Sequence, residues 1–332
     1  MLLKNKKFLI GFTFIIVLTL LSVMYSIFLY KIIPDPPKMI YGENNKLTDA
    51  PPYPPSFKFL LGVDRFGGDV FWKVIDGAKY TIAIAVIVSL FRIILSLIGS
   101  LIYTFYLGKL RFFIEAGIRA YRFIPAVILA IIFFVAVNMP DITPMELVIQ
   151  QTLILVIIGI VPLVGYLAAE TRVFLDFDFI SCSRILGASK GWIIKAHIFR
   201  YLRPRLFILF TQQVAQTLLL LVHLGVFQIV IGKEEKITSF NALASSDMVT
   251  LSLSNEWSGL IGLSYQELML DKWIIVGPSI GFVLTIYSFR LMGKGIEESF
   301  TTREEVKEDL VIEDNREIKP FIEKKPFDLK HN

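Results

Sequence analysis

The stretch "LGVDRFGGDV" places two carboxylates, Asp64 and Asp69, five residues apart and beside three glycines. Paired acids can hold a metal ion or share acid–base work. Next to glycines and outside an apolar run, they more often form turns and cap helices. We favour this structural interpretation for both residues.

Other residues that carry chemistry are sparse. The chain has one cysteine, Cys182, which excludes an internal disulfide and any site built from several cysteines. Its three histidines are too scattered for a zinc motif, and no phosphate-binding G-K-[ST] loop occurs. We therefore predict no catalytic residue, no metal site, no cofactor and no ATP hydrolysis by this chain itself.

Four polar residues fall inside long apolar runs: Arg92, Gln213, Gln216 and His223. A charge at membrane depth is costly unless it is paired or hydrated, so each residue is a candidate for a transport pathway. Helix packing is the competing interpretation for all four. For His223 we favour a neutral imidazole bonded to a backbone carbonyl, whereas for Arg92 both interpretations stay open.

The composition defines the elements that must position these residues. Of the 332 residues, 55% are hydrophobic, and the mean hydropathy is +0.63. One soluble core could not bury so much apolar surface. Runs of about 20 apolar residues each suffice to cross the bilayer as a helix. The net charge of +5 resides mainly at the ends of these runs, as topology requires, and does not indicate nucleic acid.

These runs predict an all-α polytopic membrane protein with six transmembrane helices. We expect an N-terminal anchor helix within residues 1–78, and a transmembrane core over residues 79–299 that holds the other five spans. The predicted spans cover residues 8–30, 80–107, 123–139, 147–169, 206–231 and 273–292.

Lys and Arg concentrate in the connections after the second and fourth spans, which places those connections and both termini in the cytoplasm. The segments on the other side are polar. Prolines in residues 31–78 favour an extended chain, and "SNEWSGLIG" within residues 232–271 predicts a short helix. The mixed charges of residues 300–332 predict a disordered cytoplasmic tail.

The connection over residues 170–205 has a distinct pattern. It carries Lys and Arg, and two short apolar-faced helices are predicted around Gly187. Ser189 can cap the second helix, and Pro204 would mark the start of the fifth span. Gly187 suits a left-handed elbow, which a residue with a Cβ would strain. The loop either only fixes topology or docks a cytosolic partner.

This loop resembles that of permease subunits of binding-protein-dependent ABC importers, which reads approximately E-A-A-x-x-x-G. Within that family the chain is similar to the second permease of oligopeptide, dipeptide and nickel importers. "LLGVDRFGGDV…GAKYT" is similar to that subfamily's L-G-T-D-x-x-G-R-D-V…G-x-x-x-S segment, and "GPSIGFVLTIYSFRLMGKGIEESF" to its last span. The resemblance covers nearly the whole chain in consistent order.

The resemblance implies a type I ABC importer permease with a coupling helix between spans four and five. Ser181, Cys182 and Ser183 stand where the family has Glu-Ala-Ala, and Gly187 stands at the family glycine, followed by Ala188 and Ser189. Arg184, Leu186, Gly187 and Ala188 would make the main ATPase contacts. Ser181 replaces an acid, which removes a salt bridge worth only about 0–1 kcal/mol if it is exposed.

The implied partners are a second homologous permease, two cytosolic ABC ATPases, an extracytoplasmic solute-binding protein and membrane lipid. The implied location is a bacterial inner or plasma membrane. Peptides are the favoured substrate class, with nickel or another small solute next. An ion-coupled secondary transporter would show inverted repeats and broken helices, and an intramembrane enzyme would need convergent catalytic groups. Both are alternatives that the sequence supports less well.

Overall fold

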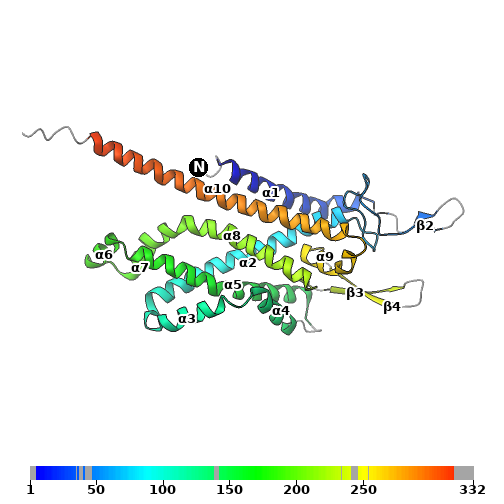
Figure 1. The fold of residues 1–332 in the computed structure, drawn as a ribbon, viewed down its shortest axis with the longest axis horizontal. Helices are drawn as coiled ribbons and strands as arrows, with labels where there is room; N and C mark the ends of the chain where they lie inside the picture. The colour runs from blue at the N-terminus through cyan, green and yellow to red at the C-terminus, as the bar shows by residue number, and fades with distance from the viewer. Residues whose placement is uncertain are drawn as a thin grey trace, which may run out of the picture.

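The computed structural model describes residues 5–34, 36, 40–41, 47–137, 142–232, 234–240, 246–252 and 254–317. Its long helices run side by side as one elongated bundle (Figure 1). Five described helices are long and apolar enough to cross a membrane, and the number becomes six if one bent pair counts as a span. The prediction of a helical polytopic membrane protein is confirmed.

Side-chain caps set the starts of two of the long helices. α1 (Lys6–Ile27) begins after Asn5, whose side chain accepts bonds from the backbone N–H of Lys7 and Phe8. α5 (Pro144–Leu175) begins with a reciprocal capping box between Thr143 and Glu146. α8 spans Phe199–Val226 and α10 spans Trp273–Glu317.

α2 (Val70–Tyr106) begins well before the predicted start near Tyr80. The reason is a cap, because the Asp69 carboxylate accepts a bond from the backbone N–H of Phe71 at 2.9 Å. Asp64 forms the preceding turn by accepting bonds from Phe66 and Gly68. The structural interpretation of both acids is confirmed.

The predicted third span is short and bent. α3 (Arg111–Tyr121) and α4 (Ala126–Val137) meet at 87°, and residues 138–141 lie outside the described residues. The described residues therefore do not form the predicted continuous span over residues 123–139. The turn between them occupies residues 122–124, and Pro125, which has no N–H to donate, lies directly before α4.

Two other helix boundaries differ from prediction. The fifth span does not start at Pro204, because helix continues from α7 (Lys190–Ile193) through a π-helical turn (Ile194–Ile198) into α8. Buried Ile198 and Leu202 hold this extension against α5. The predicted disorder of residues 300–332 is wrong up to Glu317, since α10 continues to that residue. Residues 318–332 lie outside the description.

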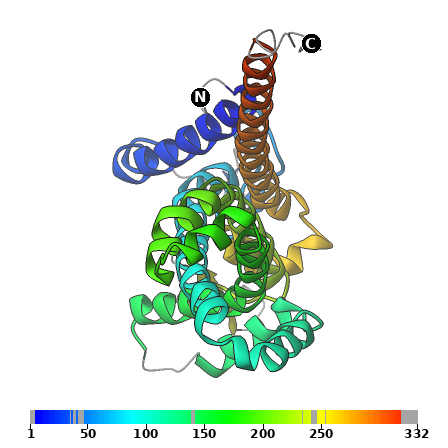
Figure 2. The same cartoon turned by 90° about the vertical axis from the view of Figure 1, so that its left-hand side faces the viewer.

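The core lies where α2, α5, α8, α10 and the short α9 (Trp257–Leu263) meet. Leu155, Leu218, Trp257 and Phe282 are among its fully buried members. Figure 2 shows α1 and α10 on one side of these helices and α3 and α4 on the other. Many side chains on the outward faces are large, apolar and exposed, as expected for helices that contact lipid.

The two ends of the bundle differ. α6 (Asp178–Ile185) and α7 lie at one end, to which the start of α1 and the end of α10 also point (Figure 1). At the other end are two antiparallel hairpins, β1 (Ile40–Tyr41) with β2 (Leu47–Asp49) and β3 (Glu234–Phe240) with β4 (Ser246–Ser252). The sequence predicted neither hairpin, but it did predict the short helix that forms α9.

Candidate functional site

The loop between α5 and α8 forms a bent helical knob. α6 ends at Ile185, and Gly187, two residues further on, has a φ of +88° in the left-handed region. The N–H of Gly187 donates to the carbonyl of Arg184, and the N–H of Ala188 donates to that of Ser183, both at 3.0 Å. This pair of bonds is the Schellman motif, which satisfies the last carbonyls of a helix. The elbow predicted at Gly187 is confirmed.

The second arm of the knob starts as predicted. Ser189 has extended backbone, and its hydroxyl accepts a bond from the N–H of Trp192 at 3.3 Å. Since α7 then continues into α8, the knob is joined to the bundle by one helix on each side. A force on α6 thus reaches α5 and α8 over short paths.

A small apolar core fixes the knob to the bundle. Ile180 of α6 is buried with Phe174 of α5, with Ile193 and Ile198 of the helix that leads into α8, and with Leu202 of α8. Tyr201 stacks on Phe174 with 4.2 Å between ring centroids. α6 is therefore packed against both neighbouring spans and does not hang as a free loop.

The tip of the knob is apolar and exposed. Ile185 and Leu186 are 85% and 88% exposed, at the far end of the molecule from the hairpins. Cys182 and Ser181 are exposed on the same helix, and Ser183 bonds back to the carbonyl of Phe179 at 2.8 Å. Two adjacent apolar side chains this exposed at a helix end are typical of a docking surface.

Arg184 is exposed on α6, two residues before Leu186. It also lines a cleft of about 330 Å³ at the base of the knob, together with Arg111 and Arg172.

Inside the bundle, Arg92 of α2 is 3% exposed and contacts two other spans. Its Nε and one terminal nitrogen donate to the carbonyl of Leu155 on α5 at 3.0 and 2.6 Å. The other terminal nitrogen lies 3.2 Å from the hydroxyl of Thr217 and 3.4 Å from Gln213 on α8. Among the described residues no carboxylate forms an ion pair with Arg92.

Gly159 of α5 makes room for this guanidinium. A Cβ on Gly159 would overlap Nε, Cδ and Cζ of Arg92. Sequence reasoning missed Gly159, and it missed Ser89, whose hydroxyl lies 3.4 Å from that of Thr217. An isolated glycine inside an apolar span was the available signal for a close approach.

The other predicted intramembrane residues are only partly brought together. Gln216 is exposed and reaches the cluster through Gln213, whose Nε2 donates to it at 2.9 Å. His223 is exposed on α8, and its Nδ1 lies 2.6 Å from the carbonyl of Leu219. The imidazole thus bonds to a backbone carbonyl, as expected, and the structure does not place it beside Arg92.

α5 contains a proline, Pro162, whose missing hydrogen bond is replaced by one from a neighbouring helix. Proline has no N–H, so the carbonyl of Ile158 has no partner one turn further along the helix. The hydroxyl of Tyr121 donates to that carbonyl at 2.9 Å and so links α3 to α5. A hydroxyl from a neighbouring helix satisfies the freed group, as expected in a membrane span.

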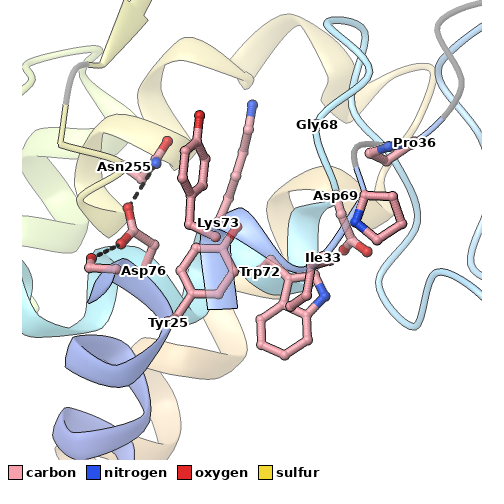
Figure 3. Close-up of a pocket in the computed structure, with 12 residues that line it drawn as sticks. Tyr25, Ile33, Pro36, Gly68, Asp69, Trp72, Lys73, Asp76 and Asn255 are labelled. Carbon is pink, nitrogen blue, oxygen red and sulfur yellow. Dashed lines mark hydrogen bonds between the residues drawn. The ribbon is translucent and has the colours of Figure 1, made fainter. Parts of the chain in front are cut away.

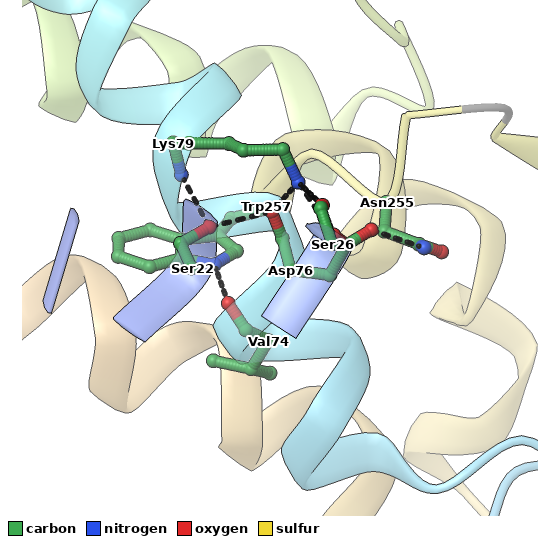
Figure 4. A network of polar contacts seen from close by, with 7 residues as sticks. All are labelled: Ser22, Ser26, Val74, Asp76, Lys79, Asn255 and Trp257. Atoms are coloured by element: carbon green, nitrogen blue, oxygen red, sulfur yellow. Dashed lines mark hydrogen bonds and ion pairs between the residues drawn. The ribbon is translucent and has the colours of Figure 1, made fainter. Parts of the chain in front are cut away.

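At the hairpin end, a polar network joins α1, α2 and the segment before α9 (Figure 4). Asp76 accepts bonds from Ser26 at 2.7 Å and Asn255 at 3.1 Å, and it pairs with Lys79. Ser22 donates to the backbone carbonyl of Asp76 at 2.9 Å. Three segments that are far apart in sequence are thereby fixed to one another.

Trp257 extends this junction into the core. Its backbone N–H donates to Thr81 at 3.0 Å, and its indole N–H donates to the carbonyl of Val74 at 2.7 Å. The preceding residue, Glu256, is buried and accepts bonds from the backbone N–H groups of Ile231, Ser258 and Gly259. Burial raises the pKa of Glu256. The sequence analysis did not identify this acid.

A cleft of about 320 Å³ lies beside the network (Figure 3). The rings of Tyr25 and Trp72 stack along its wall with 5.1 Å between their centroids, and the carboxylates of Asp69 and Asp76 also line it. Burial raises the pKa of Asp69, with a further contribution from nearby Asp64. The cleft therefore presents aromatic and acidic groups at the hairpin end.

Comparison with known proteins gives several curated relatives, whereas no family model matches the chain. An inner membrane ABC transporter permease protein of Escherichia coli is 28% identical over 155 residues, which is 46% of this chain and 43% of that protein. The chain therefore spans less than half the length of this relative.

Two further relatives match along more of their length. A dipeptide transport system permease protein of Alkalihalophilus pseudofirmus is 23% identical over 247 residues, 74% of this chain and 72% of that protein. A peptide transport system permease protein of Haemophilus influenzae is 20% identical over 272 residues, 80% of this chain and 83% of that protein.

Proposed function

We propose that this chain is the permease subunit of an ATP-driven importer. Its curated relatives are ABC transporter permease proteins, as its motifs indicated. It would form half of the translocation pathway in a bacterial inner or plasma membrane. Peptides are the favoured substrate class because several relatives carry dipeptide, peptide or glutathione transport in their names. The chain would perform no chemistry on the substrate.

The observation that carries this proposal is the exposed apolar tip on the packed knob. Leu186 and Ile185 are presented by a helix whose end is fixed by Gly187, and whose other face is buried around Ile180. An ATPase that binds the tip and moves on closure would displace α6. Because Ile180 packs between α5 and the start of α8, both spans would move with it.

The orientation proposed here puts the knob in the cytoplasm. Lys190, Lys195, Arg200 and Arg203 follow the elbow, and both described helix ends near the termini point the same way. The hairpins and the cleft lined by Asp69 and Trp72 would then face outward, where a solute-binding protein would dock. A second homologous permease would complete the pathway.

The buried cluster around Arg92 is assigned to helix packing in this proposal. The guanidinium is almost inaccessible, and its bonds connect α2 to α5 and α8. A ligand in the pathway would need an accessible group. Gln216, which is exposed on α8, is the better candidate for a pathway or a permease–permease contact.

Uptake into proteoliposomes tests the function directly. The chain should be purified with the proteins that accompany it, and uptake of a labelled peptide library should be measured with ATP inside or outside the vesicles. We expect uptake only when the ATPases receive ATP, and no loss when an ionophore collapses ion gradients. Uptake that follows an ion gradient without ATP would instead identify a secondary transporter.

A further inference from the structure

The cleft at the base of the knob is lined by three arginines from three different segments. Arg111 starts α3, Arg172 lies near the end of α5, and Arg184 lies on α6. The complete lining, about 330 Å³ in volume, is Tyr103, Thr104, Gly108, Arg111, Arg172, Leu175, Asp176 and Arg184. Guanidinium groups that converge in this way bind phosphate, because their planar N–H groups match its oxygens.

The acids near the cleft do not neutralise all of these charges. Glu115 accepts a bond from Arg111 Nε at 2.9 Å and pairs with Arg172 as well. Asp176 also lines the cleft. Arg184 makes no ion pair with any described residue. Two carboxylates therefore face three guanidinium groups, and the cleft retains positive charge.

Two further groups suit a ligand with acceptor oxygens. The hydroxyl of Thr104 is buried and has no hydrogen-bond partner among the described residues. Arg172 is held in place by stacking on the ring of Tyr103, with 4.8 Å between its Cζ and the ring centroid. A phosphate oxygen in the cleft would provide the missing acceptor for Thr104.

An adjoining cleft of about 190 Å³ has a more apolar lining. It shares Tyr103 and Arg172 with the first cleft and continues between α3 and α5, where Ile118, Gly165 and Ala169 line it. Glu115 and Arg119 complete its wall. A cationic cleft that continues into a less polar one fits a molecule that has an anionic head and a hydrocarbon chain.

α3 places these clefts at a membrane boundary. None of its residues is fully buried, and Phe112 and Phe113 are both largely exposed. The same helix carries Arg111 and Arg119, and it meets α4 at 87°. An amphipathic helix with exposed aromatic and basic residues is typical of one that lies in the interfacial layer.

We propose that the arginine cleft binds the phosphate headgroup of an anionic phospholipid, with the first part of an acyl chain in the adjoining cleft. Basic pockets beside membrane helices recognise such headgroups through the same charge–phosphate contacts. The proposal concerns the isolated chain in a membrane and does not depend on ATPase coupling. A bound lipid would connect the ends of α2 and α5 to the start of the knob.

Native mass spectrometry of the purified full chain tests this site. Phosphatidylglycerol and phosphatidylcholine with identical acyl chains are titrated separately in detergent. We expect the wild type to bind phosphatidylglycerol more tightly than phosphatidylcholine. Arg111→Gln and Arg184→Gln should each bind phosphatidylglycerol about fivefold more weakly than the wild type does, which is the effect of one basic group near an anionic surface. Arg290→Gln, which removes an exposed cation on α10 across the bundle, should bind as the wild type does.

Three results would overturn the proposal. They are equal binding of the two lipids, an equal loss with Arg290→Gln, or displacement of the lipid by inorganic phosphate at comparable concentration, which would indicate a free-anion site. Thr104→Val, which leaves the charges unchanged, should also weaken binding. If an arginine variant proves unstable in a thermal unfolding assay, Thr104→Val tests the proposal in its place.

Discussion

Arg92 on α2 and Gly159 on α5 occupy complementary positions, because the guanidinium fills the space that a side chain on the glycine would take. We expect Gly159→Ala to lower the free energy of unfolding by about 1–3 kcal/mol through overpacking. Unfolding in detergent measures this effect. Gly117→Ala, where a Cβ meets nothing within 4 Å, should leave stability unchanged or raise it by up to about 1 kcal/mol.

A double-mutant cycle tests the assignment to Arg92 itself. In an Arg92→Ala background the clash is absent, so Gly159→Ala should lose most of its penalty. Additive effects of the two substitutions would contradict this account of α5.

The exposed tip and the buried core of the knob should respond differently to substitution. Leu186 belongs to none of the hydrophobic cores that the described residues form. We therefore expect Leu186→Ser to leave thermal stability unchanged. Binding of the proposed cytosolic ATPases should weaken at least about tenfold, as for a central interface residue. Co-purification and titration of the ATPases measure it.

Ile180→Ala is the matched control, because Ile180 lies in the core of the knob. We expect it to lower stability by about 2–5 kcal/mol. If Leu186→Ser reduced stability by a similar amount, the tip would be part of the fold and not a docking surface.

Gly187 is expected to matter for its backbone alone, since a Cβ there would meet no neighbour. Gly187→Ala should cost about 1–2 kcal/mol of local stability because φ is +88°. Gly187→Pro cannot adopt this φ, and it should abolish transport and ATPase stimulation while membrane insertion stays intact. Normal uptake by the proline variant would argue strongly against coupling through this elbow.

Glu256 gives a prediction about pH. Burial raises its pKa above the ordinary value of 4.5, so the folded chain holds this proton more tightly than the unfolded chain does. Its contribution to stability is then largest at low pH and falls as pH rises above 4.5 through the folded pKa. The difference in melting temperature between wild type and Glu256→Gln should change in this direction across that range. A difference independent of pH would contradict the shift.

Local signals in the sequence predicted the parts of the fold that depend on local chemistry. Gly187, Ser189 and Asp69 each act through a backbone group within a few residues, so their roles were visible without tertiary structure. The predicted start of α2 was late because hydropathy was given more weight than the cap at Asp69.

Residues whose roles depend on packing were not predictable in this way. Nothing near Gly159 in the sequence indicates that Arg92 lies against it, and Glu256 seemed to belong to a polar outer loop. That Arg184 shares a cleft with Arg111 and Arg172 likewise depends on the tertiary arrangement of α3, α5 and α6, which hydrophobic periodicity does not specify.

The most direct measurement uses Cys182, the one cysteine in the sequence, which is exposed on α6. A membrane-impermeant maleimide should label it in inside-out vesicles and not in intact cells, and a cysteine-directed photocrosslinker at the same position should capture a cytosolic ATPase. Labelling from outside intact cells, or crosslinking that never captures an ATPase, would contradict the account.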